Sequence, residues 1–326
     1  MSTVSQLIRQ LKDDRIRIML TLFGIVWGTV SITVLSSLGE SVHRALLKGE
    51  KGLGDGLVRI AGGVTSRAYG GFPKGRWTRF TPLEGRLISE KIPEAEKVCI
   101  EFGTTNQEIT WVKHTINVQV VGVEPVFRDL RSCFPQKGGR FINDIDMREC
   151  RRVVFLGNIL KEKLFGRTSA VGKTVRIMNR PFTVIGVMRP KLQLSSYYST
   201  DSGLIFIPAT TFENLFGWRY VSGILYKPKD NTDAGATKAT IKTFLASRHG
   251  YDQADPRVWD IFDTKEVVEI LDDVGIGMRV FMFVIGALTL IVAGVGVANI
   301  MFVLVQDSTR QIGIKMAVGA KPVHIL

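Results

Sequence analysis

The sequence predicts an α+β domain of two subdomains that is inserted between two transmembrane α-helices. Two long stretches without a charged residue, 18–39 and 280–306, predict the helices, because each exceeds the roughly 20 residues that cross about 30 Å of hydrocarbon. Between them, short β-branched runs mixed with helical patterns predict the domain, which we place at residues 40–279 and expect to be extracytoplasmic.

Residues 1–17 are expected to form an amphipathic helix on the cytosolic membrane surface. Val4, Leu7, Ile8 and Leu11 recur at helical spacing, while most residues between them are polar. The uncharged stretch 18–39 is then predicted as the first transmembrane helix. A signal peptide is the alternative, but its apolar core would exceed the usual length of about 7–15 residues and no good small-residue cleavage site follows.

Within residues 40–279, five runs have the length and alternation of β-strands and are bounded by Gly, Pro or Asn. They are residues 57–60, 116–121, 152–156, 174–177 and 182–187. Three further stretches have the period of helices: residues 82–91, 158–165 and 234–249. Strands and helices mixed in this way favour an α+β fold with two subdomains.

The second predicted transmembrane helix, 280–306, is followed at once by a charged segment, 307–326. Arg310, Lys315 and Lys321 keep this segment at a water-facing surface, and small residues such as Gly313 and Ala317 allow close contact. Basic residues also precede the first transmembrane helix, so the positive-inside rule places both chain ends in the cytosol and the domain outside. The segment is therefore predicted to dock a cytosolic partner.

Small residues four positions apart occur in both predicted transmembrane helices: Gly24 and Gly28 in the first, Gly294 and Ala298 in the second. This spacing lets helix backbones approach closely in lipid. The same pattern arises by chance in apolar stretches. A helix contact at these positions is therefore a hypothesis, with the chance pattern as its alternative.

No residue pattern indicates catalysis, a metal or a cofactor. The four histidines lie far apart without ligand partners at recognised spacings, and no Gly-x-Ser-x-Gly elbow is present. Residues 166–174 resemble a phosphate-binding loop, but five residues instead of four separate Gly166 from Gly172 and a strand-like run follows, so a turn is predicted. Asp144 and Asp146 are expected to cap a helix.

The net charge of +13 does not indicate nucleic-acid binding, because the basic residues are scattered and form no basic helix. A role at the membrane surface is favoured instead. The three cysteines, Cys99, Cys133 and Cys150, are too irregularly spaced for a disulfide framework. Cys133 and Cys150 are the pair that could be oxidised outside the cytosol, and the sequence leaves that pairing open.

Two sets of residues carry a family resemblance. Residues 295–301 (Val-Gly-Val-Ala-Asn-Ile-Met) and 309–320 (Thr-Arg-Gln-Ile-Gly-Ile-Lys-Met-Ala-Val-Gly-Ala) resemble the signature of MacB/FtsX-type ABC transporter permeases. Runs within residues 138–208, among them Gly138-Gly-Arg-Phe141 and Phe182-Thr-Val-Ile-Gly-Val187, are similar, in order, to the MacB-type periplasmic core domain. The resemblance covers nearly the whole chain.

The resemblance implies a bacterial inner-membrane permease subunit that works as a homo- or heterodimer with a cytosolic ABC ATPase subunit. ATP-driven motion would pass through the helices to the periplasmic domain, for export or for extrusion of lipoproteins, peptides or drugs. A periplasmic adaptor or an outer-membrane channel would be a further partner. The segment after the second transmembrane helix would be the coupling helix seated on the ATPase, formed by Thr309, Arg310, Gln311, Ile312, Gly313, Ile314, Lys315, Ala317, Val318, Gly319, Ala320 and Lys321.

Three features depart from the family pattern. Gln311 occupies a position that usually holds Glu, and the third and fourth transmembrane helices expected after Leu326 are missing, as in a truncated or split permease. No ATPase domain is fused, so ATP hydrolysis is expected on a separate chain. The alternative function is an FtsX-like signalling subunit that regulates a periplasmic partner such as a cell-wall hydrolase. A membrane-anchored enzyme is disfavoured, because only the size of the domain supports it.

Overall fold

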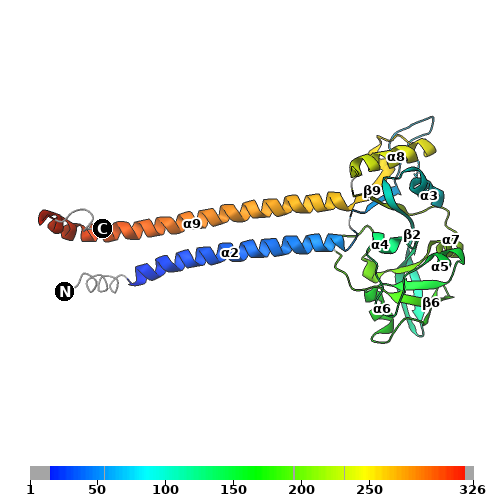
Figure 1. Cartoon of the computed structure of the whole chain (residues 1–326), viewed down its shortest axis with the longest axis horizontal. Helices are drawn as coiled ribbons and strands as arrows, with labels where there is room; N and C mark the ends of the chain where they lie inside the picture. Colours follow the sequence, from blue (N-terminus) through cyan, green and yellow to red (C-terminus); the bar gives the residue numbers. More distant parts are fainter. Residues whose placement is uncertain (1–14, 55, 194, 231, 320–326) are drawn as a thin grey trace. The chain divides into compact units, whose positions relative to one another are not determined.

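The computed structural model describes residues 15–54, 56–193, 195–230 and 232–319, and the chain falls into two compact units. One unit, Met1–Arg44 with Leu271–Leu326, contains most of two long helices, α2 (Arg15–Lys51) and α9 (Thr264–Ala317). The other unit, Ala45–Ile270, holds the strands and shorter helices and is called the head below (Figure 1).

The head mixes strands and helices along the chain, which confirms the predicted α+β fold. All five predicted strands and all three predicted helices are present, with boundaries shifted by a few residues. The strands are β1 (Val58–Gly62), β2 (Ala95–Trp111), β3 (His114–Val123), β4 (Val153–Leu156), β5 (Thr174–Ile177), β6 (Arg180–Val187), β7 (Ile205–Pro208), β8 (Gly223–Pro228) and β9 (Trp259–Asp263). The helices are α3 (Pro82–Lys91), α4 (Phe127–Leu130), α5 (Asp144–Arg148), α6 (Asn158–Phe165), α7 (Ala209–Phe216) and α8 (Ala234–His249), with short 3₁₀ turns at Asp201–Gly203 and Pro256–Val258.

One long strand, β2, belongs to two parts of the sheet. The strand order is β3-β7-β4-β6-β5-β2-β8-β1-β9, and β2 pairs in addition with β3, so the six strands from β3 to β2 close into a ring. The first part of β2, up to Glu101, pairs with β8, and the part from Glu101 onward pairs with β3. Strands β8, β1 and β9 therefore extend outward from the ring through β2.

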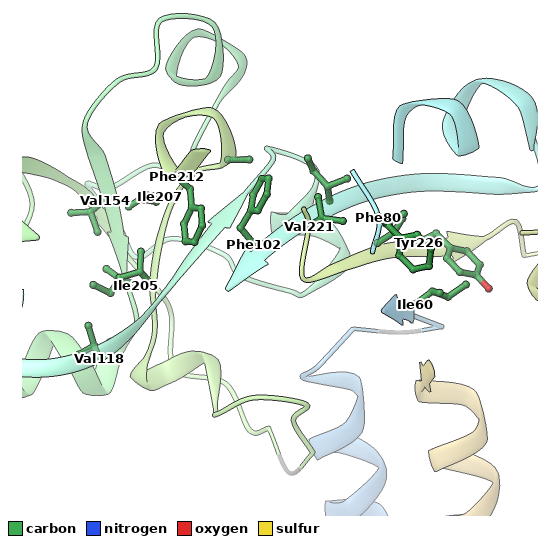
Figure 2. Packing of buried hydrophobic residues seen from close by; sticks show 14 of the residues in the cluster. Ile60, Phe80, Phe102, Val118, Val154, Ile205, Ile207, Phe212, Val221 and Tyr226 are labelled. Carbon is green, nitrogen blue, oxygen red and sulfur yellow. The ribbon is translucent and has the colours of Figure 1, made fainter. Parts of the chain in front are cut away.

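Both faces of the central strands are buried. In β4, Val154 and Leu156 belong to one apolar cluster, whereas Val153 and Phe155 belong to a second. This alternation follows the two-residue period of a strand, and burial on both sides explains why the strands read as continuous apolar runs. Figure 2 shows part of the first cluster, in which Phe102 of β2 stacks on Phe212 of α7 with ring centroids 5.2 Å apart.

The two long helices carry large apolar side chains on their surfaces. Phe23 and Trp27 of α2 are 63% and 62% exposed, and Phe283 of α9 is 76% exposed. Among the described residues, one stretch, Thr264–Val303, is long and apolar enough to cross a membrane, and it contains an 18-residue window with a mean hydropathy of 2.6. The first span, 18–39, lies in the continuous helix α2 and stays a prediction.

Small residues bring the two long helices together. A Cβ atom added to Gly28 would lie 3.2 Å from Thr289 Cγ2, and one added to Gly286 would lie 3.0 Å from Ile32 Cγ1. Gly294 faces open space and Ala298 is exposed, so the contact within this chain uses Gly286 instead of that predicted pair. The side-chain surroundings of Gly24 lie outside the described residues.

Candidate functional site

The two long helices join neighbouring strands of the head. Strand β1 follows α2 after a short connection, β9 leads directly into α9, and the two strands pair antiparallel from Val58↔Asp263 to Gly62↔Trp259. The first residue of α9, Thr264, donates two hydrogen bonds of 3.0 Å to the carbonyl oxygen of Leu57, one from its backbone N–H and one from its hydroxyl. We call this ladder, together with the buried charges beside it, the joint.

The connection between α2 and β1 passes very close to other backbone. A Cβ atom on Gly52 would lie 1.8 Å from the carbonyl oxygen of Leu192, and one on Gly54 would lie 2.0 Å from that of Leu130. Gly54 also has a φ of +129°, which side-chain-bearing residues rarely adopt. Glycine is therefore required where α2 leads into the head.

A buried arginine in β1 is the centre of the joint. Arg59 is 3% exposed, and its Nε donates to Glu101 Oε1 over 2.6 Å. Its Nη2 donates to the Tyr198 hydroxyl over 2.8 Å and to the Ser222 carbonyl oxygen over 2.7 Å. Glu101, which is fully buried, stands at the point where β2 changes partners from β8 to β3. The pair thus connects β1 to the strand shared by both parts of the sheet.

A second buried charge cluster lies beside the first. Asp201 accepts a short hydrogen bond from Arg131 Nη2, and a hydrogen bond of 2.6 Å from Lys191 Nζ. Burial alone would raise the pKa of the Asp201 carboxyl, but the two cations lower it, so the group is ionised at neutral pH. Asp201 and Lys191 belong to the connection between β6 and β7, residues 189–204, which we call the strap.

Tyr197 of the strap links the two clusters. Its ring lies under both guanidinium groups, 4.5 Å from Cζ of Arg59 and 4.6 Å from Cζ of Arg131. Burial raises the pKa of its phenol, so the hydroxyl keeps its proton and donates to Glu101 Oε2 over 2.9 Å. One side chain therefore holds the strap to β1, β2 and the residue that follows α4.

The first turn of α9 is tied to helix α8 as well. Lys238 Nζ donates to Asp263 Oδ2 and to Glu266 Oε1, each over 2.6 Å. The Lys238 amine is mostly buried, and its pKa is lowered by burial but raised more by the two carboxylates, for a net increase. The start of α9 is therefore connected to the sheet through β9 and to α8 through Lys238.

The predicted ATPase-docking segment is a direct continuation of α9. The helix runs without a break to Ala317, Val318 N–H bonds to Ile314, and Gly319 follows with a φ of +91° that ends the helix. The side chains of Gln311 and Lys315 lie outside the described residues, as do Ala320 and Lys321. The segment is largely solvent-facing: Ile312 is half-buried, and the exposed residues are Thr309, Arg310, Gly313, Ile314, Met316, Ala317, Val318 and Gly319.

The remaining sequence candidates have structural roles. Gly166 ends α6 and Thr174 starts β5, which fits the predicted turn. The helix start expected at Asp144 and Asp146 is present, but the capping residue is Asn143: Asp144 is the first residue of α5, and Asp146 is the third, which completes a capping box with Asn143. The three cysteines are free thiols, so Cys133 and Cys150 do not form a disulfide here. The described residues contain no group of three or more His, Cys, Asp or Glu that could hold a metal ion.

Sequence reasoning missed the joint. Arg59 lies in a short apolar run, and a charged residue at an inward-facing strand position signals a buried pair only when its partner is known. That partner, Glu101, lies in β2, whose mostly polar sequence was not predicted as a strand. The strap has no periodic pattern, so Tyr197 and Asp201 carried no signal at all.

Comparison with known proteins identifies the family of this chain. The sequence profile of the MacB-like periplasmic core domain matches residues 18–244, which is more than half of the chain. The chain belongs to this family, the MacB/FtsX-type permeases. Its relatives include the macrolide export ATP-binding/permease proteins MacB of Neisseria meningitidis and Rhodospirillum rubrum, each 28% identical over 96% and 98% of this chain. The chain spans about half the length, 47%, of these MacB relatives.

Solved structures agree on the fold of this MacB-type head. The periplasmic region of MacB from Actinobacillus actinomycetemcomitans superposes with a TM-score of 0.55 at 19% identity, over 70% of this chain and 97% of that one. The extracellular domain of the noncanonic ABC-type transporter YknZ from Gram-positive bacteria gives a TM-score of 0.52 at 17% identity, over 63% of this chain and 99% of that one. At these identities the likeness shows the fold alone.

Proposed function

We propose that this chain is the part of a MacB-type ABC transporter permease that transmits ATP-driven motion from a cytosolic ATPase, through α2 and α9, to a periplasmic head. Its proposed partners are this cytosolic ABC ATPase and a second permease subunit, which completes a dimer. The head acts in export or extrusion, together with a periplasmic adaptor or an outer-membrane channel. The match of residues 18–244 to the profile of the MacB-like periplasmic core domain favours this function over FtsX-like signalling.

The joint is the observation that supports this proposal. Both long helices are connected to adjacent strands, and the connection is fixed by a ladder, two buried ion-pair clusters and a glycine that no other residue can replace without a clash. A buried network of ion pairs deforms little, because any partial separation leaves charges desolvated. Such a connection passes force to the sheet instead of absorbing it.

Two substitutions in the complete permease test the docking end of α9. Gly313→Pro interrupts the helix, and Arg310→Glu reverses an exposed charge. Both should abolish coupling and recruitment of the ATPase, measured by pull-down from membranes, while membrane insertion is retained. Gly313→Ala and Arg310→Lys are the matched controls, since a Cβ on Gly313 meets nothing within 4 Å. Unchanged recruitment in both disruptive variants would refute the docking assignment.

The location of the head is tested separately. Val112, at the turn between β2 and β3, is 77% exposed, so a cysteine introduced there is open to reagents. A membrane-impermeant maleimide added to intact spheroplasts should label Val112→Cys. Labelling that requires membrane disruption would place the head in the cytosol and overturn the proposed topology.

A further inference from the structure

A hairpin in the head exposes an unusual number of aromatic side chains. Residues 64–80, which we call the aromatic hairpin, are paired through the bridges Val64↔Trp77 and Tyr69↔Phe72. Gly70 and Gly71 form its tip with φ values of +57° and +81°, and added Cβ atoms there would meet nothing within 4 Å. The tip therefore projects into open space.

The base of the aromatic hairpin is held rigidly by one carboxylate. Asp255, 1% exposed, accepts hydrogen bonds from the backbone and hydroxyl of Ser66, both 2.6 Å, and from the backbone N–H groups of Arg67 and Arg257, 3.1 and 3.0 Å. Burial alone would raise the pKa of Asp255, but these hydrogen bonds lower it to about 2. The clamp is thus intact at any physiological pH.

The upper part of the hairpin is preformed as well. The guanidinium of Arg76 stacks between Phe72 and Tyr251, 4.1 and 4.6 Å from the ring centroids, and donates to the Gly250 carbonyl oxygen over 2.7 Å. Little conformational entropy remains to be lost when such a surface binds, which favours its use in recognition.

Three rings of this rigid hairpin stay in contact with water. Trp77, Tyr69 and Phe72 are 64%, 51% and 47% exposed. At the end of the hairpin, where Phe80 bridges to Val221, Tyr220 is 40% exposed and carries the guanidinium of Arg79 at 5.2 Å from its ring centroid. Trp, Tyr and Arg are the side chains that dominate the binding energy in protein interfaces.

The charge of the hairpin indicates which chemical groups its partner presents. Residues 64–80 contain four cations, Arg67, Lys74, Arg76 and Arg79, and no Asp, Glu, Asn or Gln. Its charged side chains therefore offer hydrogen-bond donors without acceptors, which suits carboxylates and suits sugar hydroxyls poorly. Lys74 and Arg79 are both exposed.

We propose that the aromatic hairpin is the docking site for an acidic surface of a partner protein. Trp77, Tyr69 and Phe72 supply the apolar contact, while Lys74 and Arg79 pair with Asp or Glu side chains of the partner. The proposal rests on the proposed function in one respect: a periplasmic head makes the partner a protein of the cell envelope.

Site-specific photo-cross-linking in cells tests the docking site. A photoreactive phenylalanine replaces Trp77 in the full-length protein, and the matched control carries it at Val112, another exposed apolar residue at a hairpin turn that also has a lysine, Lys113, beside it. We expect a protein adduct from position 77 whose cross-linked peptide is rich in Asp or Glu. The adduct should be absent from position 112 and lost in the double variant Lys74→Glu, Arg79→Glu.

Purified components then measure the interaction. With the captured protein, Trp77→Ala should weaken Kd about thirtyfold, as expected for a central aromatic anchor. Charge reversal at Lys74 and Arg79 should weaken it about tenfold and reduce its salt dependence, and reversal of the cross-linked carboxylates should restore it. Unchanged unfolding midpoints of these variants confirm that the hairpin is folded.

Several results would overturn this proposal. They are an adduct with a glycan or lipid, equal capture from positions 77 and 112, or a Kd unaffected by charge reversal. A failure of the proposed function is distinguishable, since it shows in the maleimide labelling of Val112→Cys and in ATPase recruitment. Neither of those measurements depends on the hairpin.

Discussion

The two ends of helix α9 are held in different ways. At its first turn, Thr264 bonds to Leu57 across the joint, and Lys238 of α8 pairs with Asp263 and Glu266. Near its last turn, the described hydrogen bonds run within the helix itself, as from the Thr309 hydroxyl to Val305 O, and Val318 is 84% exposed. One end is thus fixed by this chain, whereas the other presents apolar surface to solvent.

This difference matters for how a helix can transmit motion. In the proposed function, α9 can move the head only if the two are rigidly connected, and the buried ion pairs of the joint form that connection. In the proposed function the opposite end makes a reversible contact with the ATPase, and exposed apolar residues beside Arg310 suit such a partner surface. The comparison predicts that substitutions at the joint change stability, whereas equivalent substitutions at the far end do not.

The largest effect is expected from Glu101→Ala. It leaves Arg59 buried without its main partner and should lower the free energy of unfolding by about 3–5 kcal/mol. Urea unfolding of the full chain in detergent, followed by tryptophan fluorescence, measures this. Asp260→Ala is the matched control, because Asp260 pairs with the same arginine at 3.3 Å but is 70% exposed, so a loss within about 1 kcal/mol is expected. Equal losses would contradict the special role of the buried pair.

The contribution of the Asp201 cluster to the free energy of unfolding should depend on pH. At pH 7, Asp201→Asn should cost about 3 kcal/mol, because Arg131 and Lys191 lose their carboxylate. The folded-state pKa of Asp201 is depressed, so its contribution is complete above the unfolded value of about 3.9 and is lost as pH falls through the lower folded value. Unfolding curves at several pH values should therefore show the wild type and the variant converging in acid. A constant difference down to pH 2 would exclude this titration.

Gly52, in the connection between α2 and the head, has no room for a side chain. Gly52→Ala should destabilise the head by about 1–3 kcal/mol, because the new methyl group would overlap the Leu192 carbonyl oxygen and push the strap away. Gly203→Ala, in the same strap, is the control, since a Cβ there meets nothing within 4 Å. Thermal unfolding of both variants distinguishes a specific clash from a general effect of replacing glycine.

The smallest effects on stability are expected from two threonine substitutions that compare the two ends of α9 directly. Thr264→Val removes a buried hydrogen bond to Leu57 and should cost about 1 kcal/mol. Thr309→Val removes an exposed hydrogen bond to the preceding turn and should leave the unfolding midpoint nearly unchanged. If both threonines proved equally important, the contrast between the two ends would fail.

The elements predicted from sequence are those with a strong local pattern. Strands β4 and β6 are apolar runs between turn residues, and α6 and α8 have clear helical periods, so local propensity and burial agree there. Strand β2 was missed because much of it is solvated and its sequence, Ala95–Trp111, contains polar residues at many positions. Its role comes from pairing with three different strands, which no local pattern encodes.

The docking segment could be predicted from the sequence, whereas the joint could not. Residues 309–321 form a contiguous motif, so a family resemblance could indicate them from sequence, and their role on the ATPase stays a prediction. Arg59, Glu101, Tyr197 and Asp201 are scattered along the chain and meet only after the ring and the strap have formed.

The sequence by itself determined the apolar stretches, the local strands and helices, and the family, because each depends on residues that are neighbours in the chain. Tertiary structure alone decided which strand belongs to both parts of the sheet and which charges are buried together. It also decided that α2 and α9 lead into paired strands. The physical reason is that the cost of burying Arg59 or Asp201 is offset only by partners distant in sequence, and folding brings those partners together.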